Sequence, residues 1–401
     1  MGFDAQTATQ RIRRLLHEVV DDGQLPGVVA LVRHDGQVQV QEAFGHAQTT
    51  PTRRPMRPDT VFDLASLTKP LAATAVTLAL VDQGMVALDE EITRHLPELR
   101  PVAGAGVTIR RLLTHSSGLS GWRPLYAKGQ GRDAALRQIA ELGITYSPGS
   151  RFEYSDLGMI TLGIALERIA GRRLDALVTD LIFAPLGLTG TSYLPPGQPD
   201  RYAATEDGNT FERRMTDWAG LDFGGWRHGC YPGEVNDGNA HYALDGVSGH
   251  AGLFADAQDV GVLGQLWLDG GTYAGTRVLS EAVVRLARSN QSPPGNARRG
   301  LGWALGSTQP PTRQELSRAD AGLFPPAASP WAPRSSGELL GDTAFGHTGF
   351  TGTSLWCDPQ ARLVVVLLTN ATHPVVDLAK GVDRLRARLH NAVAACVTQD
   401  D

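Results

Sequence analysis

The tetrapeptide Ser66-Leu67-Thr68-Lys69 follows an apolar run, Val61-Phe62-Asp63-Leu64-Ala65, and precedes an alanine-rich one, Pro70-Leu71-Ala72-Ala73-Thr74-Ala75-Val76. The second run predicts a buried helix. Residues i and i+3 share a helix face, so we expect Lys69 beside the Ser66 hydroxyl, at the end where backbone N–H groups point outward. Burial would lower the pKa of the lysine, and a neutral amine can accept the proton of a serine nucleophile. The alternative is a capping Ser66 and a surface Lys69, because this spacing is common by chance.

The composition is that of a soluble globular protein with a sizeable core. The 401 residues are 42% hydrophobic and 20% charged, and the net charge is −5. Basic residues form no long run, which disfavours nucleic-acid binding. Three scattered cysteines, Cys230, Cys357 and Cys396, predict free buried thiols and no disulfide framework.

No targeting segment is visible in the sequence. The N-terminus lacks a basic segment followed by an apolar stretch, so no signal peptide is recognised. Apolar runs such as Leu363–Leu368 are too short to span a bilayer. We therefore expect a cytoplasmic protein, unless a leader was removed during cloning. The oligomeric state is not predicted.

Both ends of the chain predict sheet strands. An apolar stripe from Ile12 to Val20 at helical spacing predicts a first helix over about residues 5–22. Val28–Val32 and Val38–Phe44 flank Asp35-Gly36, a strong hairpin signal. Near the C-terminus we predict four strands and a closing helix, over Gly300–Leu305, Ala344–His347, Gly352–Cys357, Leu363–Thr369 and Asp377–Val393.

The middle of the chain is predicted to be mostly helical. The helical patterns are Leu71–Val81, Ile109–Leu113, Ala134–Leu142, Met159–Ile169 and Leu174–Ile182. The predicted fold is α+β, an antiparallel sheet flanked by helices with an inserted, mostly helical region. Residues 1–65 and 231–401 would form the α/β part of one catalytic unit, and residues 66–230 the helical part. Residues 307–341 show no period, so we expect a loop there that acts as a lid.

Two further segments carry groups suited to chemistry. Tyr154 follows a Pro148-Gly149 turn and precedes a helix, and a phenol near a cationic lysine has a lowered pKa and can shuttle protons. A Tyr packed by its ring is the alternative there. Phe345–Thr353 contains a glycine-rich edge strand that could offer backbone N–H groups to a substrate carbonyl. A glycine-containing β-turn is the alternative for this segment.

The order Ser-x-x-Lys, Tyr-Ser-Asp, His-Thr-Gly resembles the serine β-lactamase and penicillin-binding-protein superfamily, in its class C β-lactamase, D-alanyl-D-alanine peptidase and family VIII esterase branch. The resemblance extends over nearly the whole chain. Further matching stretches are Leu112-Leu113-Thr114-His115-Ser116-Ser117-Gly118-Leu119, Pro185-Leu186-Gly187-Leu188, Gly249-His250-Ala251-Gly252-Leu253-Phe254 and Gly300-Leu301-Gly302-Trp303.

The resemblance implies a serine hydrolase that works through an acyl-enzyme. Ser66 would be acylated, Lys69 and Tyr154 would share the proton transfer, and the N–H groups of Ser66 and Phe350 would form the oxyanion hole. Asp156 and the segment His347-Thr348-Gly349-Phe350 would contact the substrate, with His347 and Thr348 at a polar or anionic part of it. The implied substrates are small esters, amides or lactams, and no cofactor or metal is implied.

Two departures from the family pattern favour an esterase. β-Lactamases of this branch usually carry Asn where this chain has Asp156, and an ionised carboxylate only accepts hydrogen bonds. Asp156 could instead pair with Lys69, keep it charged and leave Tyr154 as the base. β-Lactamases usually carry Lys in place of His347, and a neutral histidine should weaken carboxylate recognition. A D-amino-acid peptidase or a weak β-lactamase is the alternative.

Other functions remain open at this stage. A non-catalytic acyl sensor would be labelled once on Ser66 without turnover, and an acyltransferase would pass the acyl group to an alcohol. A metal site is disfavoured, because the metal-capable side chains between residues 228 and 241 match no standard zinc spacing. Those side chains are His228, Cys230, Glu234, Asp237 and His241. This segment is expected to form a wall of the cleft, and His250 a packed or hydrogen-bonded core residue.

Overall fold

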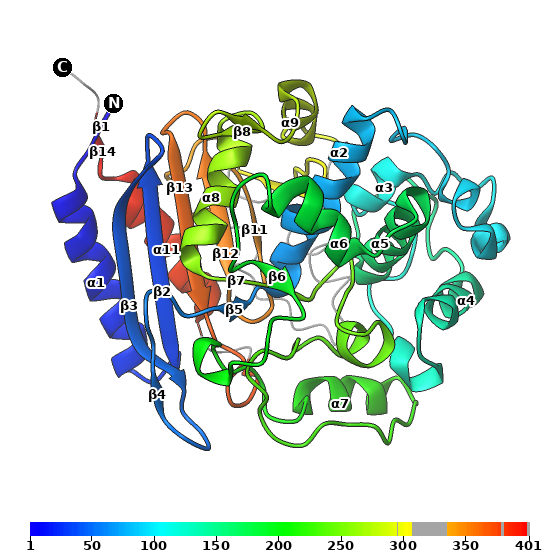
Figure 1. The fold of residues 1–401 in the computed structure, drawn as a ribbon, viewed down its shortest axis with the longest axis horizontal. Helices are drawn as coiled ribbons and strands as arrows, with labels where there is room; N and C mark the ends of the chain where they lie inside the picture. The colour runs from blue at the N-terminus through cyan, green and yellow to red at the C-terminus, as the bar shows by residue number, and fades with distance from the viewer. Residues whose placement is uncertain (295, 307–334, 378–380, 399–401) are drawn as a thin grey trace.

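A seven-stranded antiparallel sheet forms one side of the molecule (Figure 1). The computed structural model describes residues 1–294, 296–306, 335–377 and 381–398. The strand order is β10-β11-β12-β13-β2-β3-β4, so both ends of the chain build the sheet, as predicted. The strands are β2 (Gly27–His34), β3 (Gln37–Gln48), β4 (Arg54–Pro55), β10 (Ala304–Leu305), β11 (Phe345–Thr348), β12 (Ser354–Asp358) and β13 (Leu363–Thr369).

The predicted hairpin is confirmed at the centre of this sheet. Asp35 and Gly36 connect β2 to β3 with φ of 48° and 75°, the left-handed conformation that a two-residue hairpin turn requires. On the other side of β2, β13 pairs in register, with Val365 opposite Val32. The two strands are entirely buried, which explains their continuous apolar sequences.

Each face of the sheet has its own hydrophobic core. Val28, Ala30 and Val32 point to the face covered by α1 (Ala5–Asp21) and α11 (Val382–Ala394). Val29 and Leu31 point to the opposite face, where α8 (Ala257–Leu268) packs between the sheet and the helical region. This alternation follows from the two-residue period of a strand. Figure 1 shows α1 and α8 on opposite sides of β2 and β3.

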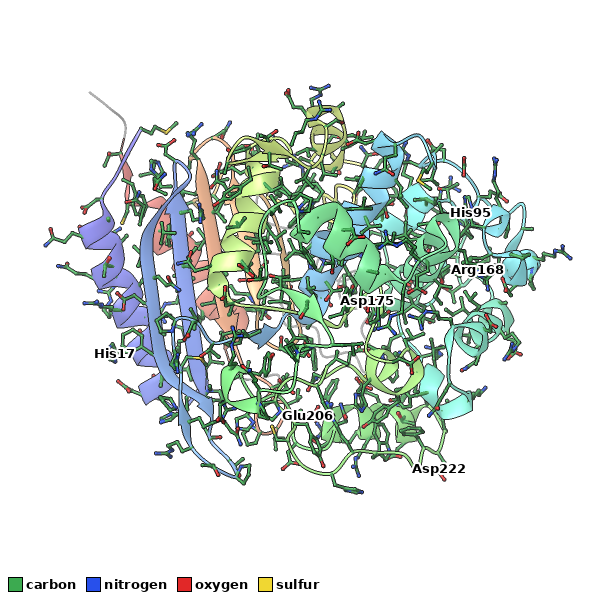
Figure 2. The ribbon with its side chains drawn as sticks, in the orientation of Figure 1. His17, His95, Arg168, Asp175, Glu206 and Asp222 are labelled. Atoms are coloured by element: carbon green, nitrogen blue, oxygen red, sulfur yellow. The ribbon has the colours of Figure 1, made fainter. Side chains whose placement is uncertain are left out.

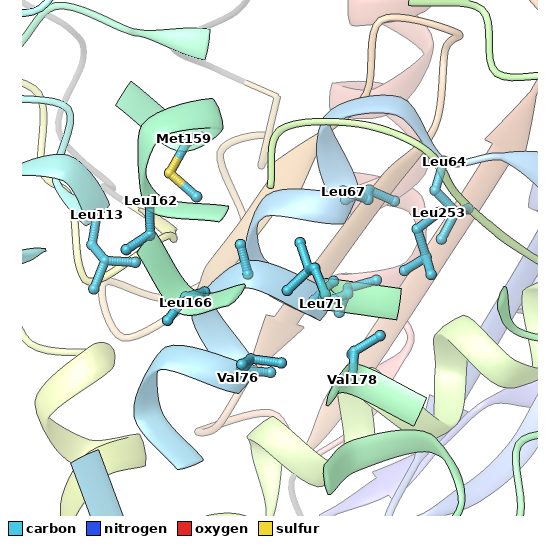
Figure 3. Packing of buried hydrophobic residues seen from close by; sticks show 14 of the residues in the cluster. Leu64, Leu67, Leu71, Val76, Leu113, Met159, Leu162, Leu166, Val178 and Leu253 are labelled. Carbon is cyan, nitrogen blue, oxygen red and sulfur yellow. The ribbon is translucent and has the colours of Figure 1, made fainter. Parts of the chain in front are cut away.

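The helical region packs on the α8 side of the sheet. The run that contains Ser66 forms a 3-10 turn (Ala65–Leu67) and then a π turn (Lys69–Thr74), which leads into α2 (Ala75–Asp82). Leu67 and Leu71 of this run share one cluster with Met159 and Leu162 of α5 (Figure 3). The other helices are α3 (Ile109–Leu113), α4 (Arg132–Leu142), α5 (Asp156–Ala170), α6 (Leu174–Val178), α7 (Thr210–Trp218) and α9 (Glu281–Ala287).

Short elements complete the fold. A three-stranded sheet has the order β5-β7-β6, and β1 pairs with β14, which joins the two ends of the described chain. These strands are β1 (Gly2–Phe3), β5 (Phe62–Asp63), β6 (Ser192–Tyr193), β7 (Leu253–Ala255), β8 (Thr272–Tyr273), β9 (Thr276–Arg277) and β14 (Val397–Thr398). The remaining single turns are the 3-10 turns Ile92–Arg94, Pro97–Val102, Leu125–Lys128 and Pro199–Arg201 and the π turns Thr179–Phe183 and Asn239–Ala243. None of the helices in the described ranges has both the length and the apolar character needed to cross a bilayer.

The predicted strand over Gly300–Leu305 is wrong for most of its length. Only Ala304 and Leu305 pair with β11. A Cβ on Gly300 would lie 1.9 Å from the Ala287 carbonyl oxygen, and one on Gly302 would lie 2.0 Å from Thr74 Oγ1. The two glycines therefore let the chain pass close to α9 and to the helical run after Ser66.

The observed bounds of the other predicted elements differ less from the predicted ones. The closing helix α11 begins at Val382, five residues later than predicted, and ends one residue later. Of the predicted lid over residues 307–341, residues 307–334 lie outside the described residues. Residues 335–341 lie in a turn that packs on α11, where His390 Nδ1 donates to the Ser335 carbonyl (2.6 Å).

Candidate active site

The chain around Ser66 is held in a strained turn. Ala65 has φ of 46°, a left-handed conformation that is unfavourable for alanine. The Asp63 carboxylate accepts the N–H of Ala65 (2.8 Å) and, from a distant loop, the N–H of Asn236 (2.7 Å). Burial raises the pKa of the Asp63 carboxyl to about 6, against the effect of these two hydrogen bonds. This buried carboxyl fixes the backbone immediately before Ser66.

Lys69 lies beside Ser66, as the spacing predicts, although the helix there is not regular. Lys69 Nζ donates to Ser66 Oγ (2.8 Å) and to the His250 carbonyl (3.0 Å), and it pairs with Asp156 Oδ1 (2.8 Å). The side chain is fully buried. Three acceptors match the three N–H bonds of an ammonium group.

The expectation that burial lowers the pKa of Lys69 is wrong. Burial alone would lower it, but the Asp156 carboxylate and Tyr154 outweigh this effect, and the pKa of Lys69 is raised. A nearby opposite charge stabilises the charged form of a buried group. The alternative expectation, that Asp156 pairs with Lys69 and keeps it charged, is confirmed.

Tyr154 lies over Lys69 and is packed by two imidazoles. Lys69 Nζ is 4.9 Å from the centroid of the Tyr154 ring. The ring of His115 lies 4.4 Å from that of Tyr154, and the ring of His347 lies 6.1 Å away. His115 Nδ1 accepts the N–H of Ser155 (3.1 Å), which ties the Tyr154 loop to the end of α3.

His115 is a site residue that the sequence analysis did not place. It belongs to the Leu112–Leu119 stretch quoted for the family resemblance, which was the available signal. Burial lowers its pKa well below the usual value, and the positive charges of Arg299 and then Lys69 lower it further. His115 is therefore a neutral ring that supports Tyr154.

Asp156 is positioned by the start of α5. Ser155 caps this helix by accepting the N–H of Gly158 (2.9 Å), and Asp156 is the first helical residue. A carboxylate is stabilised at a helix N-terminus by the unpaired N–H groups and the helix dipole. Its backbone N–H donates to the Gly121 carbonyl (2.8 Å), so the carboxylate is held toward Lys69.

His347 and Thr348 lie on β11, with Tyr154 beside the His347 ring. His347 is buried, and its Nδ1–H donates to the Thr348 carbonyl (2.8 Å). Burial, then the charges of Arg299 and Lys69, lowers the pKa of His347 well below its usual value. The ring is neutral, so Nε2 carries a lone pair, and this atom has no partner within the described residues.

Gly349 and Phe350 form a turn that is locked against the Ser66 loop. The side chain of Thr353 donates to the Leu64 carbonyl (3.0 Å), and that of Thr351 donates to the Asp63 carbonyl (2.8 Å). A Cβ on Gly349 would lie 2.1 Å from Thr353 Oγ1, so this close packing requires glycine. The backbone N–H of Phe350 donates to no acceptor in the described part of the chain.

Arg386 fixes this turn from the far side of the sheet, and no sequence pattern identified it. Its guanidinium, buried on α11, donates to the carbonyls of Gly349 (3.0 Å) and Thr353 (2.9 Å). Asp383 supplies its counter-charge. Oxyanion-hole donors must be aligned before the reaction, and Arg386 aligns the turn that contains Phe350.

The segment from His228 to His241 contributes Asp237 as the partner of a buried core histidine. Asp237 pairs with His250 (2.8 Å), and His250 Nδ1 lies 2.7 Å from Ser248 Oγ. His250 is thus a hydrogen-bonded core residue, as expected. The described residues hold no group of three or more metal-binding side chains, and ionisable residues such as His17, Arg168 and Asp222 lie on separate edges of the molecule (Figure 2).

A cavity of about 430 Å³ lies apart from these residues. Trp122 and Pro124 line it on one side, and Trp218 and Leu221 on the other. None of the residues predicted for the site lines it, so it does not hold the reacting groups.

The Beta-lactamase family model matches residues 12–389 of this chain. Among curated proteins, the N-acetylmuramyl-L-alanine amidase of Bacillus subtilis (strain 168) is 31% identical over 400 residues, which cover 93% of this chain and 84% of the relative. That protein's name describes an amidase, whereas one similar solved structure is described as a carboxylesterase.

Two solved structures illustrate the likeness of fold. EstCE1, described as a hydrolase with promiscuous acyltransferase activity, superposes with a TM-score of 0.70 at 24% identity, covering 97% of this chain and 99% of its own. A family VIII carboxylesterase superposes with a TM-score of 0.65 at 20% identity, covering 97% of each chain. At these identities the likeness shows the fold alone.

Proposed function

Since the chain belongs to the Beta-lactamase family and is a serine hydrolase, we propose that it hydrolyses carboxylic esters through an acyl-enzyme on Ser66. The observation that carries this proposal is the 2.8 Å ion pair between Lys69 and Asp156. A carboxylate at this position accepts hydrogen bonds and cannot donate to a substrate amide carbonyl. The neutral His347 ring likewise offers no positive charge to a lactam carboxylate at its own position.

In the proposed mechanism Tyr154 is the base. Lys69 donates to Ser66 Oγ and the His250 carbonyl and forms an ion pair with Asp156, so as an ammonium group it orients the Ser66 hydroxyl and stabilises negative charge near it. Tyr154 acts as a phenolate beside the Lys69 ammonium, and its oxygen takes the Ser66 proton and becomes a neutral phenol as Oγ attacks the ester carbonyl carbon. The negative oxygen of the tetrahedral intermediate accepts the N–H groups of Ser66 and Phe350, each worth about 3 kcal/mol.

Collapse of this intermediate completes the first half-reaction. The carbon–oxygen bond to the leaving group breaks, and the alkoxide takes the proton from Tyr154 and departs as an alcohol. A water molecule then loses a proton to Tyr154 and attacks the acyl carbon. The acid is released as Ser66 recovers its proton.

Steady-state hydrolysis of p-nitrophenyl butyrate tests the proposal, with a chromogenic cephalosporin measured alongside. We expect ester turnover by the wild type and a loss of about 1,000-fold or more in Ser66→Ala. Ser289→Ala, which alters an exposed serine outside the site, is the matched control and should keep the wild-type rate. Equal ester rates in Ser66→Ala and wild type, or faster turnover of the cephalosporin than of the ester, would refute the proposal.

A peptidase or amidase acting on D-amino-acid peptides is the second candidate. The amidase name of the 31% identical relative favours it. Release of D-alanine from a peptide that ends in D-alanyl-D-alanine, at a higher kcat/KM than ester hydrolysis, would support it. Stoichiometric labelling of Ser66 by both substrate classes without steady-state product would instead indicate an acyl sensor.

A further inference from the structure

Arg299 lies beside the site, and no acidic group in the described part of the chain pairs with its guanidinium. Its backbone is fixed, because its carbonyl accepts the N–H of Gln291 (2.7 Å) and its own N–H donates to Asn290 Oδ1 (3.3 Å). The side chain leaves this fixed backbone and places Cζ 4.8 Å from the centroid of the Phe152 ring. Arg299 is half-buried at this position.

A layer of rings connects Arg299 to the reacting groups. The Phe152 ring meets the His115 ring edge-on, with centroids 6.1 Å apart, and His115 lies 4.4 Å from Tyr154. Arg299 is also the first of the charges that lower the pKa values of His115 and His347, ahead of Lys69 in both cases. The Arg299 guanidinium is therefore near the rings of Phe152, His115 and His347.

The acidic residues nearest in the sequence to this layer are already paired. Glu153 pairs with Arg151 (2.7 Å), and Asp156 pairs with Lys69 (2.8 Å). Within the described ranges, the Arg299 side chain makes neither an ion pair nor a hydrogen bond. Burial lowers its pKa, yet a guanidinium in a protein stays protonated. Among the described residues, this cation therefore has no counter-ion.

Arg299 Cζ lies over the Phe152 ring, and the guanidinium N–H groups donate to no acceptor within the described ranges. A guanidinium stacks by its flat face, and its N–H donors lie in the plane, where they match the two oxygens of a carboxylate. His347 cannot fill this role, because its neutral ring presents the lone pair of Nε2, which would repel an anion. We propose that Arg299 binds a carboxylate of the substrate, so that the preferred substrates are esters that carry a second, ionised acid group.

This inference rests on the proposed esterase function and identifies its substrate class. It is tested first by binding, without turnover. Boronic acids add reversibly to an active-site serine, so we compare meta-carboxyphenylboronic acid with the isosteric meta-carbamoylphenylboronic acid by isothermal titration. The second comparison is kcat/KM for p-nitrophenyl hydrogen glutarate against the neutral p-nitrophenyl valerate.

We expect the wild type to favour the anionic member of each pair by about 10-fold or more, as a charge-assisted bidentate hydrogen bond implies. In Arg299→Gln both ratios should fall to about one, and Arg299→Lys should retain part of the preference. Arg298→Gln is the matched control. This neighbouring arginine donates to the carbonyls of Gly306 and Asp342, and its loss should leave both ratios at the wild-type value.

The possible outcomes separate this inference from the proposed function. Turnover of the neutral ester with no anionic preference, or a preference that survives in Arg299→Gln, overturns the Arg299 assignment and leaves the esterase proposal intact. Failure to hydrolyse either ester overturns the esterase proposal, while the boronic acid ratio still tests Arg299. Absence of any boronic acid adduct contradicts both.

Discussion

Lys69 donates to Ser66 Oγ and the His250 carbonyl and is paired with Asp156, and its raised pKa leaves it without a lone pair to accept a proton. The tetrapeptide spacing predicts the first of these contacts, because it depends only on local helical geometry. The other two come from residues far away in the sequence, and they reverse the effect of burial on the pKa of the lysine. Apolar neighbours alone therefore predict a shift of the Lys69 pKa in the wrong direction.

Asp156→Asn is predicted to change both stability and substrate preference. An amide retains one acceptor but removes the counter-charge of the buried Lys69, so we expect the free energy of unfolding to fall by about 1–3 kcal/mol, less than for a fully buried pair. The amide can also donate to a substrate carbonyl, so the ratio of cephalosporin to ester kcat/KM should rise about 10-fold. Steady-state kinetics on both substrates, with urea unfolding, checks this prediction. An unchanged ratio would remove the argument from Asp156 to an esterase.

Tyr154→Phe is predicted to lower kcat for ester hydrolysis about 100-fold or more, because general-base catalysis commonly contributes this much. Tyr146→Phe is the matched control, since the Tyr146 hydroxyl donates to the His115 carbonyl (3.4 Å) and is not placed at Ser66. Its expected loss is under about 3-fold, the effect of one weak hydrogen bond. Similar losses in the two variants would show that Tyr154 acts through packing and not as the base.

Three separate elements align the two proposed oxyanion donors. The turn after β11 is tied to the Ser66 loop by Thr351 and Thr353 and to α11 by Arg386. The His-Thr-Gly segment could be predicted from its glycines and its strand pattern. The role of Arg386 could not be predicted, because a charged residue on the closing helix is expected to be exposed to solvent. Only the tertiary structure shows that it is buried.

Arg386→Gln and Arg388→Gln test this alignment as a matched pair on one helix. Arg388 lies at the surface and pairs with Glu18, so its loss should cost under about 1 kcal/mol of stability. Arg386 is buried and its loss leaves Asp383 and two carbonyls without their donor, so we expect a cost of about 3 kcal/mol. Since the Phe350 N–H would also lose its alignment, kcat should fall about 10-fold in the Arg386 variant. Burst kinetics with a p-nitrophenyl ester would contradict this if the acylation rates of the two variants were equal.

The errors in the predicted elements share one physical cause. The Gly300–Leu305 segment has the composition of a strand, but Gly300 and Gly302 are needed for close approach to Ala287 and Thr74. Such contacts between distant segments are invisible to a periodic pattern. Two apolar elements, β13 and α3, were predicted with their exact bounds.

Across the whole molecule, the antiparallel sheet built from both ends of the chain could be predicted from the hairpin signal at Asp35-Gly36 and from the C-terminal strand patterns. The family resemblance was needed to bring Ser66, Tyr154 and His347 together, because no pattern within the sequence relates these distant positions. The division into residues 1–65 with 231–401 and residues 66–230 stays a prediction.

The buried histidines should make the stability of the whole molecule dependent on pH. The unfolded state binds a proton at each histidine as the pH falls below about 6.5, whereas folded His115 and His347 stay neutral. Their contribution is fully present above pH 6.5 and is lost as the pH falls, by up to about 1.4 kcal/mol per pH unit for each ring.

His347→Gln should therefore lose less stability on acidification than the wild type, by about 2 kcal/mol between pH 6.5 and about pH 5. Groups with the opposite sign, such as Asp63 with its raised pKa, are common to both proteins and cancel in the difference. Urea unfolding at several pH values measures this quantity. Parallel curves for the two proteins would show that His347 is protonated in the folded state.

The most direct test of the central claim is rapid-quench mass spectrometry of the protein during hydrolysis of p-nitrophenyl butyrate. We predict a transient adduct of one butyryl group, mapped by proteolysis to the peptide that contains Ser66 and absent from Ser66→Ala. An adduct on another residue, or steady turnover by the Ser66→Ala variant at the wild-type rate, would contradict the assignment of Ser66 as the nucleophile.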